Sequence, residues 1–214
     1  MIYNCDFREL ELPSDKNILT VTDPPFNINF KYDKHKDNMS EVDYKNMISK
    51  LRKPCVIINY PEEMIKYFIP VLGQPEKVLF WCYNSHLPRA VRMIAFFGIK
   101  PDLSKYKIPY RNPKDKRVKK LIDAGSKGTN IKEWFVVEQV KNVSKEYQGY
   151  VNQMPEKVID IILSVCEGNF NMVFDPFTGT GTTLKVAQDK GYEILGSDID
   201  EKALLIAERR LKGY

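Results

Sequence analysis

The sequence predicts an α/β fold with a doubly wound, mostly parallel sheet, and three observations support this prediction. Short apolar runs alternate with segments of helical periodicity along most of the chain. A glycine turn, Asp175 to Thr183, joins one apolar run to a helical segment. A second carboxylate, Asp198, lies about 20 residues beyond this turn, the separation at which nucleoside-binding units place a ribose ligand.

The first half of the chain supplies strands and helices in turn. We expect β-branched or apolar strands at Ile2 and Tyr3, Asn17 to Thr22, Val56 to Asn59 and Val78 to Cys82. Ser40 and Asp43 form a helix-capping pattern, and Pro61 is suited to the first turn of a second helix. A third helix is predicted from Pro88 to Phe97, closed by Gly98.

The second half begins with a change of pattern, because the alternation fails from Lys100 to about Gly128. Strand character returns at Trp134 to Val140 and at Val173 and Phe174, and again at Tyr192 to Gly196. Helices are expected from Pro155, from Leu184 to Lys190, and after Asp200. The predicted organisation is one core formed by residues 1–99 and 151–214, with residues 100–150 as a small insertion.

Composition indicates a soluble, cytoplasmic protein without a membrane partner. The 214 residues are 43% hydrophobic, which is enough to bury a core, and no apolar run approaches the ~20 residues of a membrane span. Cys5, Cys55, Cys82 and Cys166 lack the close spacing of a zinc site, so buried free thiols and no metal are expected. The net charge of +5 is modest.

The glycine turn favours a ligand that has a ribose but no phosphate. A dinucleotide site needs a third glycine where Leu184 stands, and Lys185 is misplaced for a phosphate-binding loop. S-adenosylmethionine satisfies the remaining requirements. The alternative is a strand-turn-helix unit that serves packing alone.

A second motif, Asp-Pro-Pro-Phe at Asp23 to Phe26, follows the strand that ends at Thr22. Its two prolines hold a carboxylate and an aromatic ring rigidly at the carboxyl edge of a strand. The polar segment Asn27 to Met39 that follows is predicted to be a mobile loop suited to act as a lid. Without the glycine turn, Asp23 is better explained as a turn residue.

Together, Asp-Pro-Pro-Phe and Asp-Pro-Phe-Thr-Gly-Thr-Gly-Thr-Thr resemble the amino-methylating DNA methyltransferases, which modify the exocyclic amine of adenine or cytosine. The catalytic motif precedes the cofactor turn, as in that family's permuted β group. Asn152 to Pro155 and Gly196 to Asp200 extend the resemblance over nearly the whole chain. It implies a Rossmann-like, S-adenosylmethionine-dependent methyltransferase fold that is circularly permuted.

The resemblance also implies the roles of individual residues. Asp198 is expected at the cofactor ribose, Asp6 at its adenine, and Asn152 and Gln153 over its methionine end. The expected cofactor-binding set is Asp6, Asn152, Gln153, Asp175, Pro176, Phe177, Gly179, Gly181, Thr182, Thr183 and Asp198, and the expected catalytic set is Asp23, Pro24, Pro25 and Phe26. The sequence departs from the family at Phe26, where Tyr is usual, and at Tyr150 and Met154, where His and Lys are common.

The residue types suit methyl transfer to an amine whose lone pair is delocalised into a base. Asp23 and the carbonyl of Pro24 can accept the amine hydrogens, and Phe26 can stack on a base flipped out of the duplex. Asp at position 23 favours adenine in this family. An N4-cytosine enzyme and a catalytically silent nucleic-acid-binding subunit are the alternatives.

Double-stranded DNA with a short target sequence is the expected partner. Residues 114–120 of the insertion contain a cluster of basic residues: Lys114, Lys116, Arg117, Lys119 and Lys120. We expect this cluster to contact DNA phosphates, and the alternative is a solvated surface without a binding role. A homodimer and a cognate restriction nuclease are left open. His35 and His86 are expected to be solvated polar residues, and Cys55 is rejected as a nucleophile because it begins an apolar strand.

Overall fold

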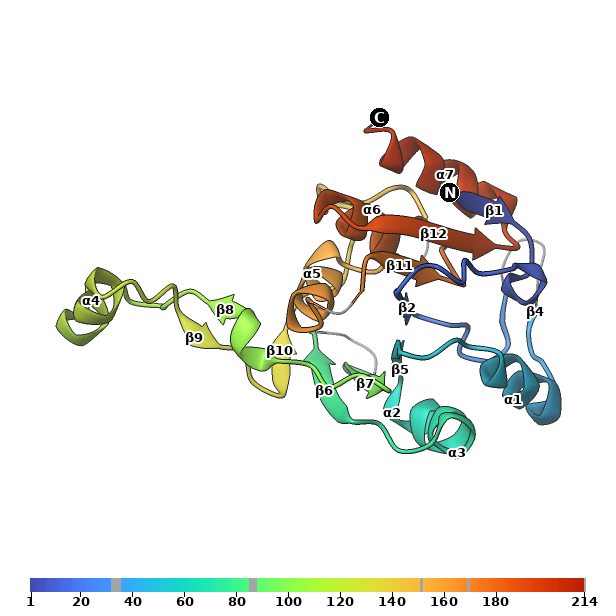
Figure 1. The fold of residues 1–214 in the computed structure, drawn as a ribbon, viewed down its shortest axis with the longest axis horizontal. Helices are drawn as coiled ribbons and strands as arrows, with labels where there is room; N and C mark the ends of the chain where they lie inside the picture. The colour runs from blue at the N-terminus through green and yellow to red at the C-terminus, as the bar shows by residue number, and fades with distance from the viewer. Residues whose placement is uncertain (32–35, 85–87, 151, 169, 214) are drawn as a thin grey trace.

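The computed structural model describes residues 1–31, 36–84, 88–150, 152–168 and 170–213. Its centre is a twisted eight-stranded sheet with helices on both faces (Figure 1). In spatial order the strands are β1 (Ile2–Asn4), β12 (Glu193–Asp198), β11 (Met172–Asp175), β2 (Ile18–Thr22), β5 (Cys55–Asn59), β7 (Val91–Phe97), β6 (Lys77–Cys82) and β10 (Trp134–Val136). The predicted α/β fold with a doubly wound, mostly parallel sheet is confirmed.

The order of the strands shows the predicted permutation. β1 pairs in parallel with β12, with Asn4 opposite Asp198, although these strands stand at opposite ends of the chain. β11 lies between β12 and β2, so the glycine turn and the Asp-Pro-Pro-Phe segment begin at adjacent carboxyl ends. Parallel strands that end at one edge bring distant carboxylates together.

Both faces of the sheet are buried, as the near-continuous apolar runs of its strands require. Along β5, Val56 and Ile58 join one hydrophobic cluster, whereas Cys55 and Ile57 join the other. The first cluster is covered by α5 (Glu156–Val165) and α6 (Thr182–Asp189), and the second by α1 (Glu41–Ser49) and by a continuous helical segment. That segment consists of α2 (Pro61–Glu63), a π-helical turn (Met64–Phe68) and α3 (Ile69–Leu72).

The expected helix caps are present. The Ser40 side chain accepts the backbone N–H of Asp43 at the start of α1. Pro61 opens α2, and Asp200 caps α7 (Glu201–Leu211) with its carboxylate. Short 3₁₀ turns follow β1 at Phe7–Glu9 and lie near the start of the insertion at Leu103–Lys105.

The predicted helix from Pro88 to Phe97 is wrong, because Val91–Phe97 forms the strand β7. β7 is antiparallel to both β5 and β6 and is the one antiparallel member described in the main sheet. The connection from β6 is too short to hold the crossover helix that a parallel strand needs. A strand buried between two others is apolar on both faces, so its sequence has no period of two that distinguishes it from a buried helix.

Two other segments differ from the sequence-based expectation. The predicted loop Asn27 to Met39 contains the short antiparallel pair β3 (Phe30–Lys31) and β4 (Lys36–Asp37), and the lid interpretation falls partly on residues 32–35, outside the described residues. The strand expected over Trp134 to Val140 is limited to β10, which pairs with β6 at the edge of the sheet. His35 and His86 also lie outside the described residues.

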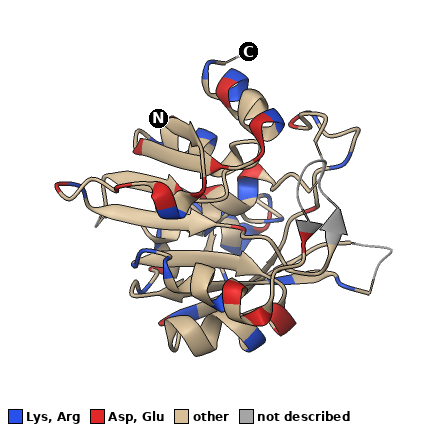
Figure 2. Ribbon diagram, turned by 90° about the vertical axis from the view of Figure 1, so that its right-hand side faces the viewer, with Lys and Arg blue, Asp and Glu red and all other residues tan. Residues whose placement is uncertain are grey.

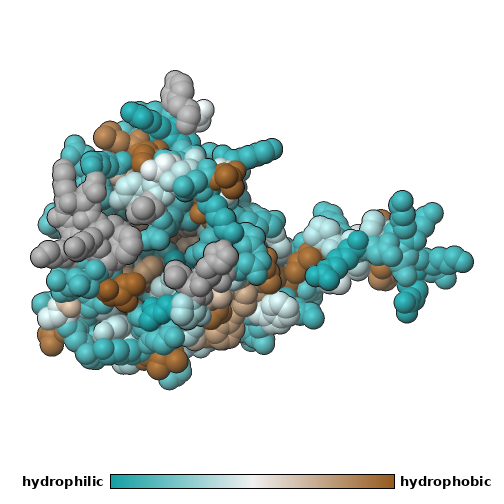
Figure 3. All heavy atoms as spheres, turned by 180° about the vertical axis from the view of Figure 1, so that it is seen from behind, coloured by the Kyte–Doolittle hydropathy of each residue, from teal (hydrophilic) through white to brown (hydrophobic). Residues whose placement is uncertain are grey.

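Part of the insertion forms an arm that projects from the core (Figures 1 and 3). Its stem is the antiparallel pair β8 (Lys107–Ile108) and β9 (Thr129–Asn130), and its tip carries α4 (Lys116–Asp123), capped by Asp115. Figure 3 shows a largely hydrophilic surface on the arm. β10 follows the arm and belongs to the main sheet, whereas the division into 1–99, 100–150 and 151–214 stays a prediction.

The start of α6 depends on close packing against α7. Gly181 has φ +78°, and a Cβ built there lies 2.8 Å from the Cβ of Ala207 on α7. Gly191, which follows α6, has a similar φ of +83° but no atom within 4 Å of its built Cβ. Alanine at either position strains the backbone, but only at position 181 does its Cβ also clash with a neighbouring residue.

We predict that Gly181→Ala lowers the free energy of unfolding more than Gly191→Ala does. Strain at positive φ costs about 1 kcal/mol in either variant, and overpacking against Ala207 adds about 1–3 kcal/mol at position 181 alone. Urea-induced unfolding of both variants measures the difference. Equal losses would show that α7 can move away from the turn at no cost.

Candidate active site

Two adjoining cavities lie at the carboxyl edge of the central strands. The first, of about 190 Å³, is lined by residues from several separate parts of the chain, among them Asp6, Asp23, Gly179 and Asp198. The second, of about 110 Å³, is lined by Asp23, Asn152, Gln153, Asp175, Phe177, Gly179, Thr182 and Thr183, among others. Asp23, Phe177 and Gly179 line both cavities, so the glycine turn and the Asp-Pro-Pro-Phe segment share one site.

The structure thus brings together most of the residues predicted from the sequence. Pro25 and Pro176 line the first cavity as well. Of the predicted catalytic and cofactor-binding residues, Pro24, Phe26 and Gly181 are absent from the described lining of both. Gly181 instead serves the packing of α6 against α7.

The glycine turn presents open space at Gly179. This residue has φ +51°, and a Cβ built there meets no atom within 4 Å. Its backbone N–H donates to Oδ2 of Asp198 at 2.7 Å, and the N–H of Asp200 donates to Oδ1 of Asp198 at 2.9 Å. Burial raises the pKa of Asp198, while these backbone hydrogen bonds oppose the shift.

Asp175 joins the turn to the neighbouring strand. Its Oδ1 accepts the hydroxyl of Thr22 at 2.6 Å and the backbone N–H of Phe177 at 3.1 Å. The side chain is buried, and burial raises the pKa of Asp175 to about 7 in spite of these hydrogen bonds. Thr22 is the last residue of β2, so one carboxylate connects both motifs.

The Asp-Pro-Pro-Phe segment is held from two sides. The hydroxyl of Tyr44 on α1 donates to the carbonyl of Pro25. Asp37 accepts the backbone N–H groups of Asn27 and Ile28, which follow directly after the motif, at 2.8 and 3.3 Å. These contacts fix the backbone that presents Asp23 and the carbonyl of Pro24.

Asp23 itself pairs with Arg92, a residue that was not among those predicted for the site. Arg92 Nη1 donates to Asp23 Oδ2 at 2.6 Å, and Oδ1 of Asp23 is buried without a hydrogen-bond partner among the described residues. Burial raises the pKa of Asp23, and the charge of Arg92 opposes that rise.

Asp6 follows β1 and faces the first cavity while it caps a 3₁₀ turn. Its Oδ1 accepts the backbone N–H of Arg8 at 3.0 Å and the Nε–H of Arg8 at 2.9 Å. The hydrogen bonds from Arg8 lower the pKa of Asp6, so its carboxylate is charged at neutral pH. The cavity therefore carries carboxylates from three strand ends.

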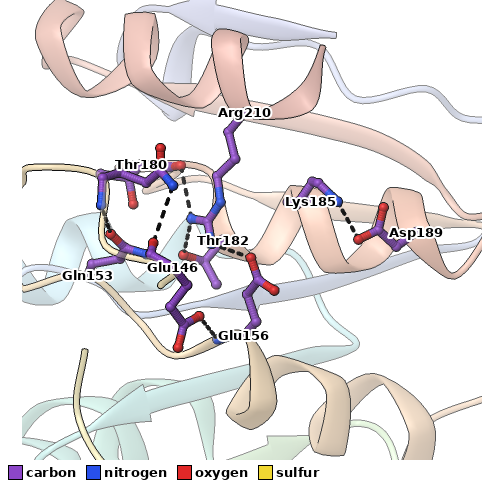
Figure 4. A network of polar contacts seen from close by, with 9 residues as sticks. Glu146, Gln153, Glu156, Thr180, Thr182, Lys185, Asp189 and Arg210 are labelled. Carbon is purple, nitrogen blue, oxygen red and sulfur yellow. Dashed lines mark hydrogen bonds and ion pairs between the residues drawn. The ribbon is translucent and has the colours of Figure 1, made fainter. Parts of the chain in front are cut away.

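The predicted methionine-end residues take part in a polar network (Figure 4). Gln153 accepts the backbone N–H of Gln148 at 2.9 Å and donates to the carbonyl of Glu146 at 2.6 Å. Arg210 of α7 donates to the hydroxyl of Thr182 at 2.7 Å and to Glu156 of α5 at 2.6 Å. These bonds tie α5, α6 and α7 together around the second cavity.

The basic residues predicted to bind DNA are all exposed on the arm. Lys116, Arg117, Lys119 and Lys120 belong to α4, and Lys114 precedes it. They line neither cavity. Figure 2 shows that core helices carry both signs of charge, as along α7, whereas residues 114–120 hold five basic side chains and one acidic one, Asp115.

Three contributors to the site were missed from the sequence: Asp37, Tyr60 and Arg92. Asp37 lay in a segment interpreted as a loop, and Arg92 in one interpreted as a helix. Tyr60, directly after β5, packs against Phe26 in a tilted arrangement with ring centroids 4.9 Å apart. The position of Tyr60 at the end of a predicted strand was the one indication that could have identified it.

The four cysteines are free thiols, as expected, although Cys5 and Cys82 are only partly buried. Burial raises the pKa of Cys55 to about 12, which agrees with its rejection as a nucleophile. Among the described residues, no helix is long and apolar enough to cross a membrane.

Comparison with known proteins identifies the family. The model of the N6-adenine and N4-cytosine methylase family, described as DNA methylase, matches residues 57–209, and the chain belongs to this family. The match begins after Asp23 to Phe26. The amino-methylating family expected from the two motifs is thereby confirmed.

Individual relatives agree with this assignment. The chain is 26% identical to the type II methyltransferase M.BglII of Bacillus subtilis over 251 aligned residues, which cover 99% of this chain and 69% of that protein. It is 33% identical to M2.DpnII of Streptococcus pneumoniae over 87 residues, or 40% of this chain and 32% of that one.

Solved structures share the fold. The PvuII DNA methyltransferase, described as cytosine-N4-specific, has a TM-score of 0.64 at 16% identity, with 100% of this chain and 93% of that chain covered. M1.HpyAVI, solved as a complex with S-adenosylmethionine, has a TM-score of 0.62 at 17% identity, with 98% of each chain covered. These likenesses confirm the Rossmann-like methyltransferase fold.

We predict that Asp175→Asn changes how stability depends on pH. Because the folded-state pKa of Asp175 is raised to about 7 from 3.8, the folded protein binds its proton more tightly than the unfolded chain does. The wild-type protein therefore loses stability as the pH rises through this range, and the neutral amide does not. Relative to Asp175→Asn, the wild type should lose about 2–3 kcal/mol between pH 5 and pH 8.

Urea-induced unfolding of both proteins across this pH range measures the effect, and their difference cancels the titration of groups that they share. A difference that stays constant with pH would contradict the buried, proton-binding environment of Asp175.

Proposed function

We propose that this protein transfers a methyl group from S-adenosylmethionine to the exocyclic amine of adenine in a short double-stranded DNA sequence. One observation carries the proposal: Asp23 of the Asp-Pro-Pro-Phe segment lines the same cavities as Gly179 and Phe177 of the glycine turn. A methyl donor held at the turn and an acceptor held by Asp23 then meet in one place.

The residues present fit this cofactor. Asp6 and Asp198 provide carboxylate acceptors for adenine and ribose groups in the first cavity, and the open space at Gly179 admits a ligand close to the backbone. Asn152, Gln153, Asp175 and Thr182 are proposed to hold the methionine end in the second cavity. When bound, the cofactor supplies a methyl group on a positively charged sulfur, open to direct attack.

Asp23 and Pro24 are proposed to activate the amine. The lone pair of an exocyclic amine is delocalised into the base, and accepting its hydrogens favours a tetrahedral nitrogen. Oδ1 of Asp23 is buried without a partner among the described residues, which supports a role as one acceptor, and the Pro24 carbonyl is the other. The carboxylate then takes the proton that the methylated amine releases, aided by its raised pKa.

Phe26 is proposed to stack on the base after the base has flipped out of the duplex. The ring of Phe26 is only 7% exposed, so stacking requires the groups around it to shift. Tyr60 contacts the ring on one side, so the base is proposed to stack on the other.

Cytosine is the second candidate substrate. The structural likeness to a methyltransferase described as cytosine-N4-specific favours it, whereas Asp at position 23 follows the adenine form of the motif. The exocyclic amines of the two bases are chemically similar, so the same two acceptors suit both.

The arm is proposed to bind DNA phosphates beside the target base. Five basic side chains at its tip are exposed and lie on or next to α4. A target sequence recognised by so small an arm is expected to be short. A cognate restriction nuclease is proposed as a partner because relatives such as M.BglII are named type II methyltransferases, and a homodimer is proposed to enlarge the contact with DNA.

We predict that purified protein with S-adenosylmethionine and mixed-sequence duplex DNA yields N6-methyladenine, and that Asp23→Ala lowers the rate by at least 100-fold. The substitution removes one of two hydrogen-bond acceptors for the amine, an effect of roughly 10²–10³ in similar cases. Mass spectrometry of the digested DNA identifies the methylated nucleoside.

Gly191→Ala, which alters a turn beyond α6, serves as the control for stability. N4-methylcytosine in place of N6-methyladenine would establish the second candidate. Cofactor binding without any methylated product, on duplexes of every sequence, would favour a catalytically silent DNA-binding subunit.

We predict that replacing Lys116, Arg117, Lys119 and Lys120 together by Ala weakens DNA binding about 10- to 100-fold at low salt and reduces its salt dependence. Each lost phosphate contact lowers the slope of log affinity against log salt by about 0.9. Fluorescence anisotropy across a salt series measures both quantities. The matched control replaces Lys50, Lys66, Arg209 and Lys212 of the core by Ala, and equal effects of the two variants would reject a specific role for the arm.

A further inference from the structure

Arg92 is a charged residue in the interior of the sheet. It stands on β7, whose antiparallel direction places its first residues at the edge where β5 and β6 end. The side chain is 5% exposed, and its Nη1 lies 2.6 Å from Oδ2 of Asp23, a side chain that is 20% exposed. A charge in such a position requires a partner, and Asp23 is the acidic side chain with which it pairs.

Aromatic rings surround the guanidinium group. Its central carbon lies 4.6 Å from the ring centroid of Phe26, 5.1 Å from that of Tyr60 and 5.5 Å from that of Trp81. These rings favour the cation and limit its rotation. The orientation of the planar Arg92 guanidinium group relative to Asp23 is therefore set by packing.

The positions of Tyr60 and Arg92 relative to Phe26 determine which side of its ring they occupy. Phe26 and Tyr60 are 4.9 Å apart, and Arg92 lies 4.6 and 5.1 Å from them, so the three groups form a nearly equilateral triangle. Arg92 and Tyr60 consequently lie toward the same side of Phe26. A base that stacks on the other side of the ring does not need to displace Arg92.

We propose that Arg92 is a positioning residue that fixes the Asp23 carboxylate through Oδ2 and so reserves Oδ1 for the target amine. The inference rests on the proposed function and assigns a role to a residue of the same site. A carboxylate held by one oxygen retains one acceptor, and Oδ1 of Asp23 is buried without another partner in the described part of the chain. Fixing its direction before the base arrives reduces the reorganisation that the reaction requires.

Arg92 also keeps Asp23 in the form that accepts hydrogen bonds. Burial raises the pKa of Asp23, whereas the charge of Arg92 and its hydrogen bond lower it. The other titratable groups around the pair are Tyr44 of α1, Tyr60 after β5 and Tyr83 after β6, together with Asp37 and Asp175 across the cavities. Among the described residues, Arg89 is a further cation nearby, over the Tyr60 ring, but it pairs with Glu63, so Arg92 is the cation that contacts Asp23.

The test compares Arg92→Met and Arg92→Lys with the control Arg89→Met. Arg89 also lies over the Tyr60 ring, at 4.6 Å, and pairs with an acid, since its Nη1 is 3.1 Å from Glu63. It does not contact Asp23 in the described structure. Arg89→Met therefore removes a neighbouring arginine and its ion pair without removing a contact to Asp23. Met retains the apolar stem of Arg92, and Lys retains its charge without the planar fork.

Three quantities are measured for each protein: the methyl-transfer rate against pH, the affinity for S-adenosylmethionine, and the titration of the Asp23 carboxyl by NMR with ¹³C-labelled aspartate. For Arg92→Met we expect a rate reduced about 100-fold, a cofactor affinity within about two-fold of the wild type, and an Asp23 titration moved upward by 1 or more pH units. Arg92→Lys should restore the titration and only part of the rate. Arg89→Met should change neither pH profile nor titration.

An unchanged Asp23 titration in Arg92→Met would overturn the proposal. A rate above that of the wild type would also overturn it, because it would show that Arg92 occupies space that the target base needs. If the wild-type protein methylates no DNA, the proposed function fails, but the NMR titration still decides whether Arg92 controls Asp23. If Arg92→Met does not fold, the proposal is judged on Arg92→Lys, where a fully retained rate would contradict the need for the fork.

Discussion

The hydrogen bond from Thr22 to Asp175 is the contact on which the site depends. It joins the ends of β2 and β11, which are 153 residues apart in the sequence and adjacent in the sheet. Asp175 also accepts the backbone N–H of Phe177, so the same carboxylate shapes the start of the glycine turn. Because the contact is buried, it is worth more than an exposed hydrogen bond, and losing either partner leaves an unsatisfied polar group. It holds the glycine turn beside the segment that carries Asp23.

The permuted chain reaches this arrangement because a parallel sheet brings together strand ends regardless of their order along the chain. β1 lies beside β12, and the side chain of Asn4 donates to the carbonyl of Asp198 at 2.9 Å. Asp6 and Asp198 therefore border one cavity although one is near the start of the sequence and the other near its end. The proposed methyl transfer requires these carboxylates to border one cavity. It does not depend on the order of the two motifs along the chain.

Much of the fold follows from local patterns in the sequence, because caps and periodicity report local structure directly. Ser40 and Asp200 start helices as expected, and the apolar runs before Asp23 and Asp175 are strands. The strand β7 could not be recognised in this way, since burial on both faces removes the alternation that identifies a strand. Arg92 was missed because no local pattern marks a cation within an apolar run as part of a site. Its role is visible only from its contact with Asp23, 69 residues away in the sequence. The two motifs were enough to predict where the site lies. The side chains that support it could be identified only from tertiary contacts.

The proposed reaction requires that the glycine turn and the Asp-Pro-Pro-Phe segment form a single site for donor and acceptor. A crystal structure with bound S-adenosylhomocysteine, the product form of the proposed cofactor, tests it most directly. We expect the ribose at Asp198, the amino-acid end over Gly179, and the sulfur directed toward Asp23. A ligand bound elsewhere, or with its sulfur directed away from Asp23, would contradict the account.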